Sequence, residues 1–597
     1  MKTRFIILFF LTAITNQLVA QKLPVVIPEQ VGLNTVHLMH IDRVVNEAIE
    51  NKEIPGAVIA IVKGSQIGYL KAFGNKQTYP INKAMEINTI FDLASCTKPL
   101  ATGIATMKLV EQGYIRLTDP VHNYLPDFRP YKTDSLERAI RIVDLLTHTS
   151  GLPAYAPVSK LLESGEPAPQ ILKDYIACCD RIHEPSKAMV YSCLNYITLQ
   201  HIITAVSKLN LDEFCAKEIF EPLNLKDTGF KLSEEQIERT APTELINNEE
   251  LLQGRVHDPL ARKLNLGISG NAGLFSTAEE VALLTSLFLN QGAIGGKRIL
   301  SAASIKKIST IPYELIQYGR TPGWDQKSPY SSHQGDLMSD AAFGHTGYTG
   351  TSITIDPERD LAIIVLTNSV HPYDKGKTIR LRALISNIVL AADGGASNQG
   401  YLKHYKTRMT MFNKEGKISK KDILFIGDSL TENGENWAKR LGNKRIRNRG
   451  IVGDNTNGVI NRLHSLVEAQ PKQVLLTIGI NDISQGLNET TLVENIEHIL
   501  KRFQKESPKT KIYLQSLLPI NENKSWYRLM KGKTNIITSV NKRLEALATK
   551  LNIEFINSYP LFLEEGGDQL DPIYTNDGLH LNEEGYRVWS DFLKQYI

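Results

Sequence analysis

Long apolar runs are scarce in this chain of 597 residues. One stands at residues 5–14, and it is shorter than the roughly 20 residues that a membrane-spanning helix needs. Lys2 and Arg4 precede it, and the sequence LVA at residues 18–20 follows as a small-residue cleavage site. We therefore expect a signal peptide at residues 1–20 and an exported, periplasmic or secreted protein without a stable membrane anchor. An N-terminal transmembrane anchor is the alternative for this segment.

Cysteine is also scarce. Five thiols are an odd number, so at least one stays unpaired within a monomer, and we expect them to act mainly as small buried apolar side chains. The chain also lacks the His/Cys/Asp spacing typical of zinc sites and a glycine-rich phosphate loop with its lysine. These absences predict a protein that needs no metal and no cofactor. The cysteines are Cys96, Cys178, Cys179, Cys193 and Cys215.

An excess of charge of either sign is absent as well. Lys and Arg number 68 against 64 Asp and Glu, which gives a formal charge of +4, and the two signs are interspersed. Nothing in this balance indicates nucleic acid as a partner. The length exceeds what one hydrophobic core serves, so we expect several domains.

The first half of the chain has strand patterns at both ends and helical material between them. Residues 57–62 and 67–72, joined by a Gly-Ser turn, predict a β-hairpin. Apolar positions at helical spacing predict a helix over residues 98–112. A second pair of strands is expected at residues 352–356 and 361–367.

The second half of the chain has a different pattern. Gly, Ala, Ser, Asn and Asp replace periodic apolar residues at 391–400, and this break together with the basic segment after it predicts a linker. Beyond it, short apolar strands alternate with helices, which indicates a parallel sheet in an α/β domain. The expected strands are 423–426, 474–478 and 512–518, and the expected helices are 436–441 and 492–504.

Ser95 and Lys98 are a candidate reactive pair in the first half. Three residues apart at the start of a helix, their side chains share one face. A serine hydroxyl is a poor nucleophile until a neighbouring base takes its proton, and a lysine pushed toward neutrality can assist. The Ser-x-x-Lys pattern alone is common, so its specificity comes from the motifs around it.

Those motifs occur in a fixed order, and together they resemble the serine β-lactamase and penicillin-binding-protein superfamily, in its class C and esterase-like branch. The resemblance covers roughly residues 30–390. It implies an antiparallel sheet flanked by helices, with a helical subdomain. The motifs are FDLASCTKP at 91–99, LLTHTSGLP at 145–153, YS at 191–192, GNAGLFST at 270–277 and GHTGYTG at 344–350.

The resemblance implies a role for each matching residue. Ser95 is the nucleophile, with Lys98 and Tyr191 jointly assigned to proton transfer because the base is disputed across the superfamily. The backbone N–H groups of Ser95 and Tyr348 form the oxyanion hole, and a glycine in the last motif lets the substrate approach the strand. The substrate-binding residues are His345, Thr346 and Gly347.

Two departures from the family pattern affect the expected substrate. His345 stands where the family often has a lysine, and an unperturbed histidine is mostly neutral at pH 7. Cys193 stands where an asparagine is common, so an amide that could bind the acyl group is missing; a disulfide to Cys96 is also conceivable there. We infer an esterase or D-amino-acid peptidase rather than an efficient β-lactamase. His148 is expected to pack a loop, and His257 is equally open to packing or to lining the cleft.

Ser429 is a second candidate nucleophile. It follows the apolar strand 423–426, at the carboxyl end where open α/β sheets bind ligands. A helix that begins after it would direct its positive end toward developing negative charge. This placement predicts a second, independent active site.

Four blocks in order resemble the SGNH (GDSL) hydrolase family over roughly residues 420–597. The resemblance implies an α/β/α domain in which Ser429 attacks an acyl carbonyl, His580 transfers the proton and Asp577 orients His580. The oxyanion meets the N–H groups of Ser429 and Gly453 and the side chain of Asn481. We expect hydrogen bonding within the turns from Asp428 and Asp482. The blocks are GDSLT at 427–431, GIVGDNT at 450–456, GIND at 479–482 and DGLH at 577–580.

We therefore expect a bifunctional serine hydrolase acting on ester- or amide-bearing substrates from glycan or cell wall. The C-terminal domain is expected to deacetylate a carbohydrate, and the N-terminal domain to act on an ester or D-peptide through an acyl-enzyme. Two alternatives concern the N-terminal domain: a penicillin-recognising D-Ala-D-Ala carboxypeptidase, or an inactive binding module. The expected limits are a signal peptide at 1–20, a first domain at 21–391, a linker at 392–420 and a second domain at 421–597.

Overall fold

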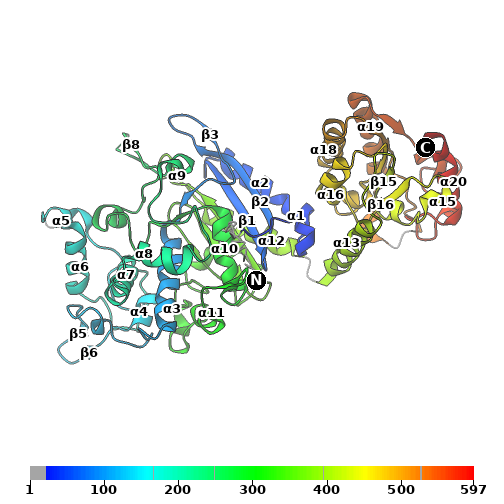
Figure 1. Ribbon diagram of the computed structural model, residues 1–597. Coiled ribbons are helices and arrows are strands. Elements are labelled where there is room, and N and C mark those ends of the chain that lie inside the picture. Colours follow the sequence, from blue (N-terminus) through cyan, green and yellow to red (C-terminus); the bar gives the residue numbers. More distant parts are fainter. Residues whose placement is uncertain (1–21, 166, 248, 375, 394–395, 525–526) are drawn as a thin grey trace, which may run out of the picture. The chain divides into compact units, whose positions relative to one another are not determined.

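The computed structural model describes residues 22–597 except 166, 248, 375, 394–395 and 525–526 (Figure 1). The predicted signal peptide lies outside the described residues. The described chain forms two compact units. Residues 22–26 and 41–390 form the first unit, and residues 27–40 and 391–597 form the second. Within the described chain, no helix combines the length and apolar character needed to cross a bilayer.

A six-stranded antiparallel sheet forms the centre of the first unit, in the order β12-β13-β14-β1-β2-β3. Both predicted strand pairs are confirmed, and β1 joins them because it pairs with β2 on one side and β14 on the other. The ends of the first half are thus brought together. The strands are β1 (Gly56–Lys63), β2 (Gln66–Gln77), β3 (Lys83–Ala84), β12 (Phe343–Thr346), β13 (Ser352–Asp356) and β14 (Leu361–Thr367).

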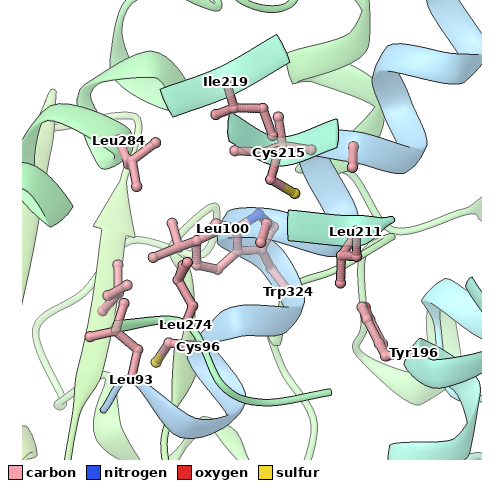
Figure 2. Close-up of a cluster of buried hydrophobic side chains, with 14 of the residues drawn as sticks. Leu93, Cys96, Leu100, Tyr196, Leu211, Cys215, Ile219, Leu274, Leu284 and Trp324 are labelled. Carbon is pink, nitrogen blue, oxygen red and sulfur yellow. The ribbon is translucent and has the colours of Figure 1, made fainter. Parts of the chain in front are cut away.

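Helix α10 (Ala278–Leu289) packs against β1 and β14 and links the sheet to the helical part of the unit. One hydrophobic core runs through both parts. Figure 2 shows Leu93, Cys96 and Leu100 within it, close to Leu274 and Trp324. Further helices of the unit are α2 (His40–Glu50), α4 (Ile142–Leu146), α6 (Ala168–Cys178), α7 (Cys193–Ser207), α11 (Ala302–Ile308) and α12 (Ile379–Ala392).

Two of the five cysteines behave as the sequence predicts, whereas Cys179 and Cys193 are only partly buried. Cys96 and Cys215 are fully buried among apolar side chains, and Cys178 is exposed. All five thiols are free, so the conceivable bridge between Cys96 and Cys193 is not formed.

The helix predicted over residues 98–112 is present in two parts. A π-helical segment spans Lys98–Gly103, and α3 continues it over Ile104–Glu111. Lys98 is completely buried at its start, so this wide turn carries a charged side chain into the interior.

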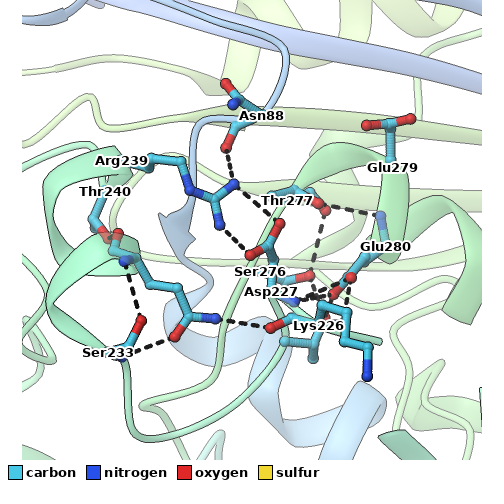
Figure 3. A network of polar contacts seen from close by, with 12 residues as sticks. Asn88, Lys226, Asp227, Ser233, Arg239, Thr240, Ser276, Thr277, Glu279 and Glu280 are labelled. Carbon is cyan, nitrogen blue, oxygen red and sulfur yellow. Dashed lines mark hydrogen bonds and ion pairs between the residues drawn. The ribbon is translucent and has the colours of Figure 1, made fainter. Parts of the chain in front are cut away.

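A polar network fixes the strand that precedes the first site. Figure 3 shows Arg239 paired with Asp227, whose backbone N–H lies 3.0 and 3.1 Å from the carboxylate oxygens of Glu280. Glu280 is on α10, which begins directly after β9 (Phe275–Ser276). Because β9 pairs with β4 (Phe91–Asp92), the network helps hold the chain three residues before the predicted nucleophile.

The second unit contains a five-stranded parallel sheet in the order β16-β15-β17-β18-β19, which confirms the predicted α/β class. Leu424 and Ile426 of β15 face one core, whereas Ile423 and Phe425 face another. This alternation makes three layers. One face is covered by α16 (Thr456–Glu468), α18 (Glu489–Glu506) and α19 (Thr534–Leu551), and the other by α15 (Trp437–Arg440) and α20 (Glu583–Leu593). The strands are β15 (Ile423–Gly427), β16 (Ile446–Gly450), β17 (Gln473–Thr477), β18 (Lys511–Gln515) and β19 (Glu554–Ile556).

Most of the predicted linker is helical. Helix α13 spans Ala396–Lys414, and Tyr405 and Phe412 pack with Ile451 of the second unit. The small and basic residues of this segment predicted a linker. The segment nevertheless contains apolar side chains that pack on one side of a helix.

Residues 27–40 belong to the second unit although residues of the first unit stand on both sides of them in the sequence. They contain the short helix α1 (Thr35–Leu38), whose residue Val36 joins the core on the α16 face of the sheet. The N–H of Asn34 donates to the carbonyl of Ala392 at 2.8 Å. A hydrophobic core of the second unit is thus completed by an N-terminal segment.

Candidate active sites

The structure brings Ser95 and Lys98 into direct contact in the first unit. Lys98 Nζ lies 2.9 Å from Ser95 Oγ and 3.0 Å from the carbonyl oxygen of Asn271. Its ammonium is also 3.9 Å from Cys193 Sγ and 4.9 Å from the ring centre of Tyr191. These contacts hold the ammonium of Lys98 next to the hydroxyl of Ser95.

The surroundings of Lys98 favour its charged form. Burial opposes its charged form, but Cys193, Tyr191 and the Asp258 carboxylate outweigh this and raise the pKa of Lys98 above its usual value. Lys98 is therefore an ammonium that donates to Ser95 Oγ. Of the two residues assigned jointly to proton transfer, this leaves Tyr191 as the candidate acceptor.

Tyr191 is held by aromatic contacts. Its ring stacks on His148 with centres 4.4 Å apart, and His148 Nδ1 accepts the N–H of Ser192 at 3.0 Å. Burial, with help from Arg320 and Lys98, lowers the pKa of His148 well below its usual value. His148 thus packs as a neutral ring, in agreement with the prediction.

A cavity of about 780 Å³ contains most of the predicted residues of the first site. Burial lowers the pKa of His345 well below its usual value, and its Nδ1 donates to the Thr346 carbonyl at 2.9 Å. His345 is therefore neutral, as its place in the motif predicts. The predicted residues that line the cavity are Ser95, Tyr191, His345, Thr346, Gly347 and Tyr348.

The strand edge beside Ser95 is close-packed. A Cβ on Gly347 would lie 2.5 Å from the carbonyl oxygen of Leu93, so glycine is needed for the chain's own packing as well as for substrate approach. Ala94, directly before the nucleophile, has a left-handed φ of 45°, a conformation that strains a non-glycine residue. Tyr348 is exposed, stacks on His257 at 5.7 Å and donates to Asp374 at 2.6 Å. His257 thus lies beside the cleft.

Arg320 is a functional candidate that the sequence did not reveal, because it stands in none of the motifs. It lines the same cavity, is 1% exposed, and has its guanidinium 5.4 Å from the ring centre of Tyr191. Its Nε and Nη1 donate no hydrogen bond within the described chain, and the nearest carboxylate oxygen, on Asp325, is 4.0 Å away. Buried donors of this kind normally have an acceptor, so the cavity is suited to an anionic group.

The second unit brings together the three predicted catalytic residues. His580 Nε2 lies 2.9 Å from Ser429 Oγ, and His580 Nδ1 lies 2.7 Å from Asp577 Oδ2. Asp577 also accepts the N–H groups of Leu579 and His580 at 2.9 and 2.8 Å. Burial acts against the charge of Asp577, but these hydrogen bonds lower its pKa. The relay from carboxylate to imidazole to hydroxyl is continuous.

The predicted oxyanion donors lie in the turn after β16 and in the short helix α17 (Ile480–Ser484) after β17. Gly453 has a φ of 80°, which favours glycine. The side-chain amide of Asn481 donates to the carbonyl of Asp454 at 2.8 Å, which fixes it beside that turn. Both segments follow the carboxyl ends of their strands, at the same sheet edge as Ser429.

Asp428 and Asp482 support these turns. The carboxylate of Asp428 accepts the N–H of Leu430 at 2.9 Å, and that of Asp482 accepts the N–H and hydroxyl of Thr456. Burial raises the pKa of Asp428 to about 7 and that of Asp482 to about 6. Both have the predicted hydrogen-bonding role.

The described residues contain no group of three or more His, Cys, Asp or Glu side chains arranged to hold a metal ion.

Two curated relatives and two solved structures resemble the first part of the chain. A putative D-alanyl-D-alanine carboxypeptidase of Escherichia coli K12 is 31% identical over 391 residues, which cover 60% of this chain and 89% of that protein. One of Salmonella typhimurium is 29% identical over 400 residues, covering 62% and 91%. The structure titled "EstCE1, a hydrolase with promiscuous acyltransferase activity" is 23% identical, with a TM-score of 0.49 and coverage of 60% and 99%. An octameric penicillin-binding protein homologue from Pyrococcus abyssi is 22% identical, with a TM-score of 0.47 and coverage of 62% and 81%.

Family models account for both units. The model described as Beta-lactamase matches residues 41–386, and the model described as GDSL-like Lipase/Acylhydrolase family matches residues 425–588. Both are families of serine hydrolases. The chain belongs to the β-lactamase family and carries a GDSL-like acylhydrolase domain after it.

Proposed function

We propose that this protein is an exported enzyme with two serine hydrolase sites. The first site cleaves a D-peptide that ends in a free carboxylate, through an acyl-enzyme on Ser95. The second removes a short acyl group, with acetyl as the first choice, from a carbohydrate through Ser429. Export is supported by the N-terminal sequence, and a cell-wall substrate is supported by the names of the relatives.

The observation that carries the first half of the proposal is the buried guanidinium of Arg320. Within the described chain, Nε and Nη1 donate no hydrogen bond and Nη1 has only the longer ion pair with Asp325 at 4.0 Å, so a substrate carboxylate placed there would accept from both. Charge-assisted hydrogen bonds of this type are strong. Arg320 thus supplies the permanent cation that His345 lacks. A peptide with a free C-terminus fits this charge better than a neutral ester does.

The reaction at the first site follows from the contacts of Ser95. Tyr191, as its phenolate, takes the proton of the Ser95 hydroxyl while the Lys98 ammonium, 2.9 Å from the oxygen, stabilises the charge that develops on it. Ser95 Oγ bonds to the carbonyl carbon, the C–N bond breaks, and Tyr191 returns the proton to the leaving amine. The N–H groups of Ser95 and Tyr348 receive the carbonyl oxygen. Water then hydrolyses the acyl-enzyme.

The second half of the proposal is carried by the triad. His580 takes the proton from Ser429 and returns it to the leaving alcohol, while Asp577 stabilises the imidazolium. The N–H of Gly453 and the amide of Asn481 receive the oxyanion. This arrangement suits an ester, whose alcohol is a good leaving group.

A matched pair of peptides tests the first site. D-Alanine release is measured from a tripeptide ending in D-Ala-D-Ala and from the same tripeptide amidated at its C-terminus. We expect release from the free acid, little from the amide, and none from the Ser95→Ala variant. Equal turnover of acid and amide would contradict carboxylate recognition. No turnover, with no labelling of Ser95 by fluorescent penicillin, would favour the binding-module alternative.

An ester assay tests the second site. Release of acetate from acetylated xylan or acetylated peptidoglycan is compared between the wild type, Ser95→Ala, Ser429→Ala and the double variant. We expect Ser429→Ala alone to abolish it. Deacetylation that survives in Ser429→Ala and disappears in Ser95→Ala would assign the esterase activity to the first site instead.

A further inference from the structure

Helix α13 lies before the residues that match the acylhydrolase family, yet it contacts the turn that carries Gly453. Arg408 on this helix is buried. Its Nη2 and Nε donate to the carbonyl oxygen of Gly450 at 3.0 and 3.2 Å. Gly450 is the last residue of β16, so Arg408 holds the point at which the turn begins.

The same guanidinium also holds the turn through a carboxylate. Arg408 Nε lies 3.3 Å from Glu432 Oε1, and Glu432 Oε2 accepts the N–H of Val452 at 2.6 Å. Glu432 ends the short helix α14 (Ser429–Glu432), which begins at the predicted nucleophile. His404, one turn before Arg408 on α13, contacts the same carboxylate at 2.9 Å.

The turn has little freedom between these anchors. A Cβ on Gly450 would lie 2.3 Å from the backbone nitrogen of Glu432, so the strand end presses directly on α14. Val452, whose N–H is bound to Glu432, immediately precedes Gly453. The chain leading into Gly453 is thus held by two hydrogen bonds, one from Arg408 to Gly450 and one from Val452 to Glu432, and Arg408 contacts the acceptor of the second.

We infer that Arg408 is a positioning residue for the second site. It acts from outside the family-matched domain by holding residues 450–453 so that the N–H of Gly453 faces the oxyanion of the reacting ester. The inference rests on the proposed ester hydrolysis at Ser429. Its consequence is specific, because a misaimed oxyanion donor weakens transition-state binding more than substrate binding.

The test uses the full chain carrying Ser95→Ala, with p-nitrophenyl acetate as substrate. We expect Arg408→Met to lower kcat by about 10- to 100-fold, because displacements near 1 Å at a reacting centre have effects of this size, and to leave KM within about two-fold. Arg408→Lys keeps a cation near Glu432 but loses the paired donors of the guanidinium. Its kcat should therefore lie between that of the Ser95→Ala parent and that of Arg408→Met. Unchanged kcat in both folded variants would overturn the inference.

Arg449→Met is the matched control. Arg449 is also buried, and its guanidinium lies 4.6 Å from the ring centre of Phe412 on α13 and 2.6 Å from Glu415, the residue directly after that helix. Its side chain forms no hydrogen bond with residues 450–453 within the described chain. Loss of Arg449 should lower the melting temperature as much as loss of Arg408 but leave kcat within about two-fold. An equal loss of kcat in both variants would show that general docking of α13, and not Arg408, is responsible, and would overturn the inference.

A second readout separates the inference from the proposed function. A fluorophosphonate probe phosphonylates Ser429 through an oxyanion-like transition state, whether or not the protein hydrolyses acetate. If the parent lacks esterase activity, the proposed function fails, but slower phosphonylation in Arg408→Met than in Arg449→Met still supports the positioning role. Equal phosphonylation rates would overturn it.

Discussion

The ammonium of Lys98 donates to the hydroxyl of Ser95 over 2.9 Å, inside a fully buried environment. The contact is the reverse of the one expected from a neutral amine, since the proton is on the lysine. Lys98 therefore acts on the first site as a fixed positive charge beside the oxygen that attacks.

Replacing Lys98 by methionine should slow acylation of Ser95 by about 100- to 10,000-fold, the usual range for a lost group in proton transfer or charge stabilisation. The rate of fluorescent penicillin labelling measures this step, and Ser429-dependent esterase activity in the same sample is the internal control. Because the pKa of Lys98 is raised, the wild-type labelling rate should show no rise with deprotonation of Lys98 between pH 6 and 9. A rise that disappears in the methionine variant would contradict the charged state.

Replacing Arg320 by methionine should reduce kcat/KM for a peptide with a free C-terminal carboxylate by about 10- to 100-fold, the effect of removing one charged hydrogen-bond partner. The amidated peptide should be unaffected. Arg380→Met is the control, because Arg380 lines the same cavity but is exposed. If both variants lose the same activity, general positive charge and not Arg320 selects the substrate.

Replacing Asp428 by asparagine should make the second unit more stable at alkaline pH. Burial, with the nearby carboxylates of Asp454 and Asp482, raises the pKa of Asp428 from 3.8 to about 7. The folded state thus holds a proton that the unfolded state loses near pH 4, so stability falls as pH rises from about 4 to 7. The asparagine stays neutral, and its oxygen can still accept the N–H of Leu430.

Urea unfolding at pH 4 and pH 8 measures this difference. The gain from Asp428→Asn should be small at pH 4 and reach roughly 4 kcal/mol at pH 8, the order of magnitude that the change in pKa implies. The same gain at both pH values would show that the carboxyl is not the titrating group.

Replacing Val36 by aspartate should unfold the second unit at a lower temperature while the first unit stays intact. Val36 is 8% exposed and packs in the core beside Leu424 and Ile426, and a buried unpaired charge costs several kcal/mol. Val25→Asp is the control, since Val25 is 55% exposed. Calorimetry should show one transition shifted, and penicillin labelling of Ser95 should be unchanged. A shift of the transition that belongs to the first unit would contradict the assignment of residues 27–40.

The sequence alone was sufficient to predict the elements whose apolar residues recur with a clear period. It was also sufficient to predict which residues of the ordered motifs lie together. The hairpin of β1 and β2 and the contact of His580 with Ser429 belong to these groups. Arg320 could not be found in this way, because a single arginine outside any motif has no pattern and its burial depends on the whole fold. Helix α13 was missed because Tyr405 and Phe412 are dispersed among basic and polar residues. The charge of Lys98 depends on Cys193, Tyr191 and Asp258, which are all distant from it in sequence.

Residues 27–40 give the chain an order of assembly. The second unit needs both this segment and residues 391–597, so it cannot be completed until the last part of the chain has been synthesised. The first unit is continuous from residue 41 to residue 390 and can fold earlier, as N-terminal domains generally do during synthesis. Until the second unit has been synthesised, Val36 lacks the core residues against which it packs in the folded protein. A gene cut between the two units would leave the downstream enzyme permanently without the piece that the upstream fragment carries away.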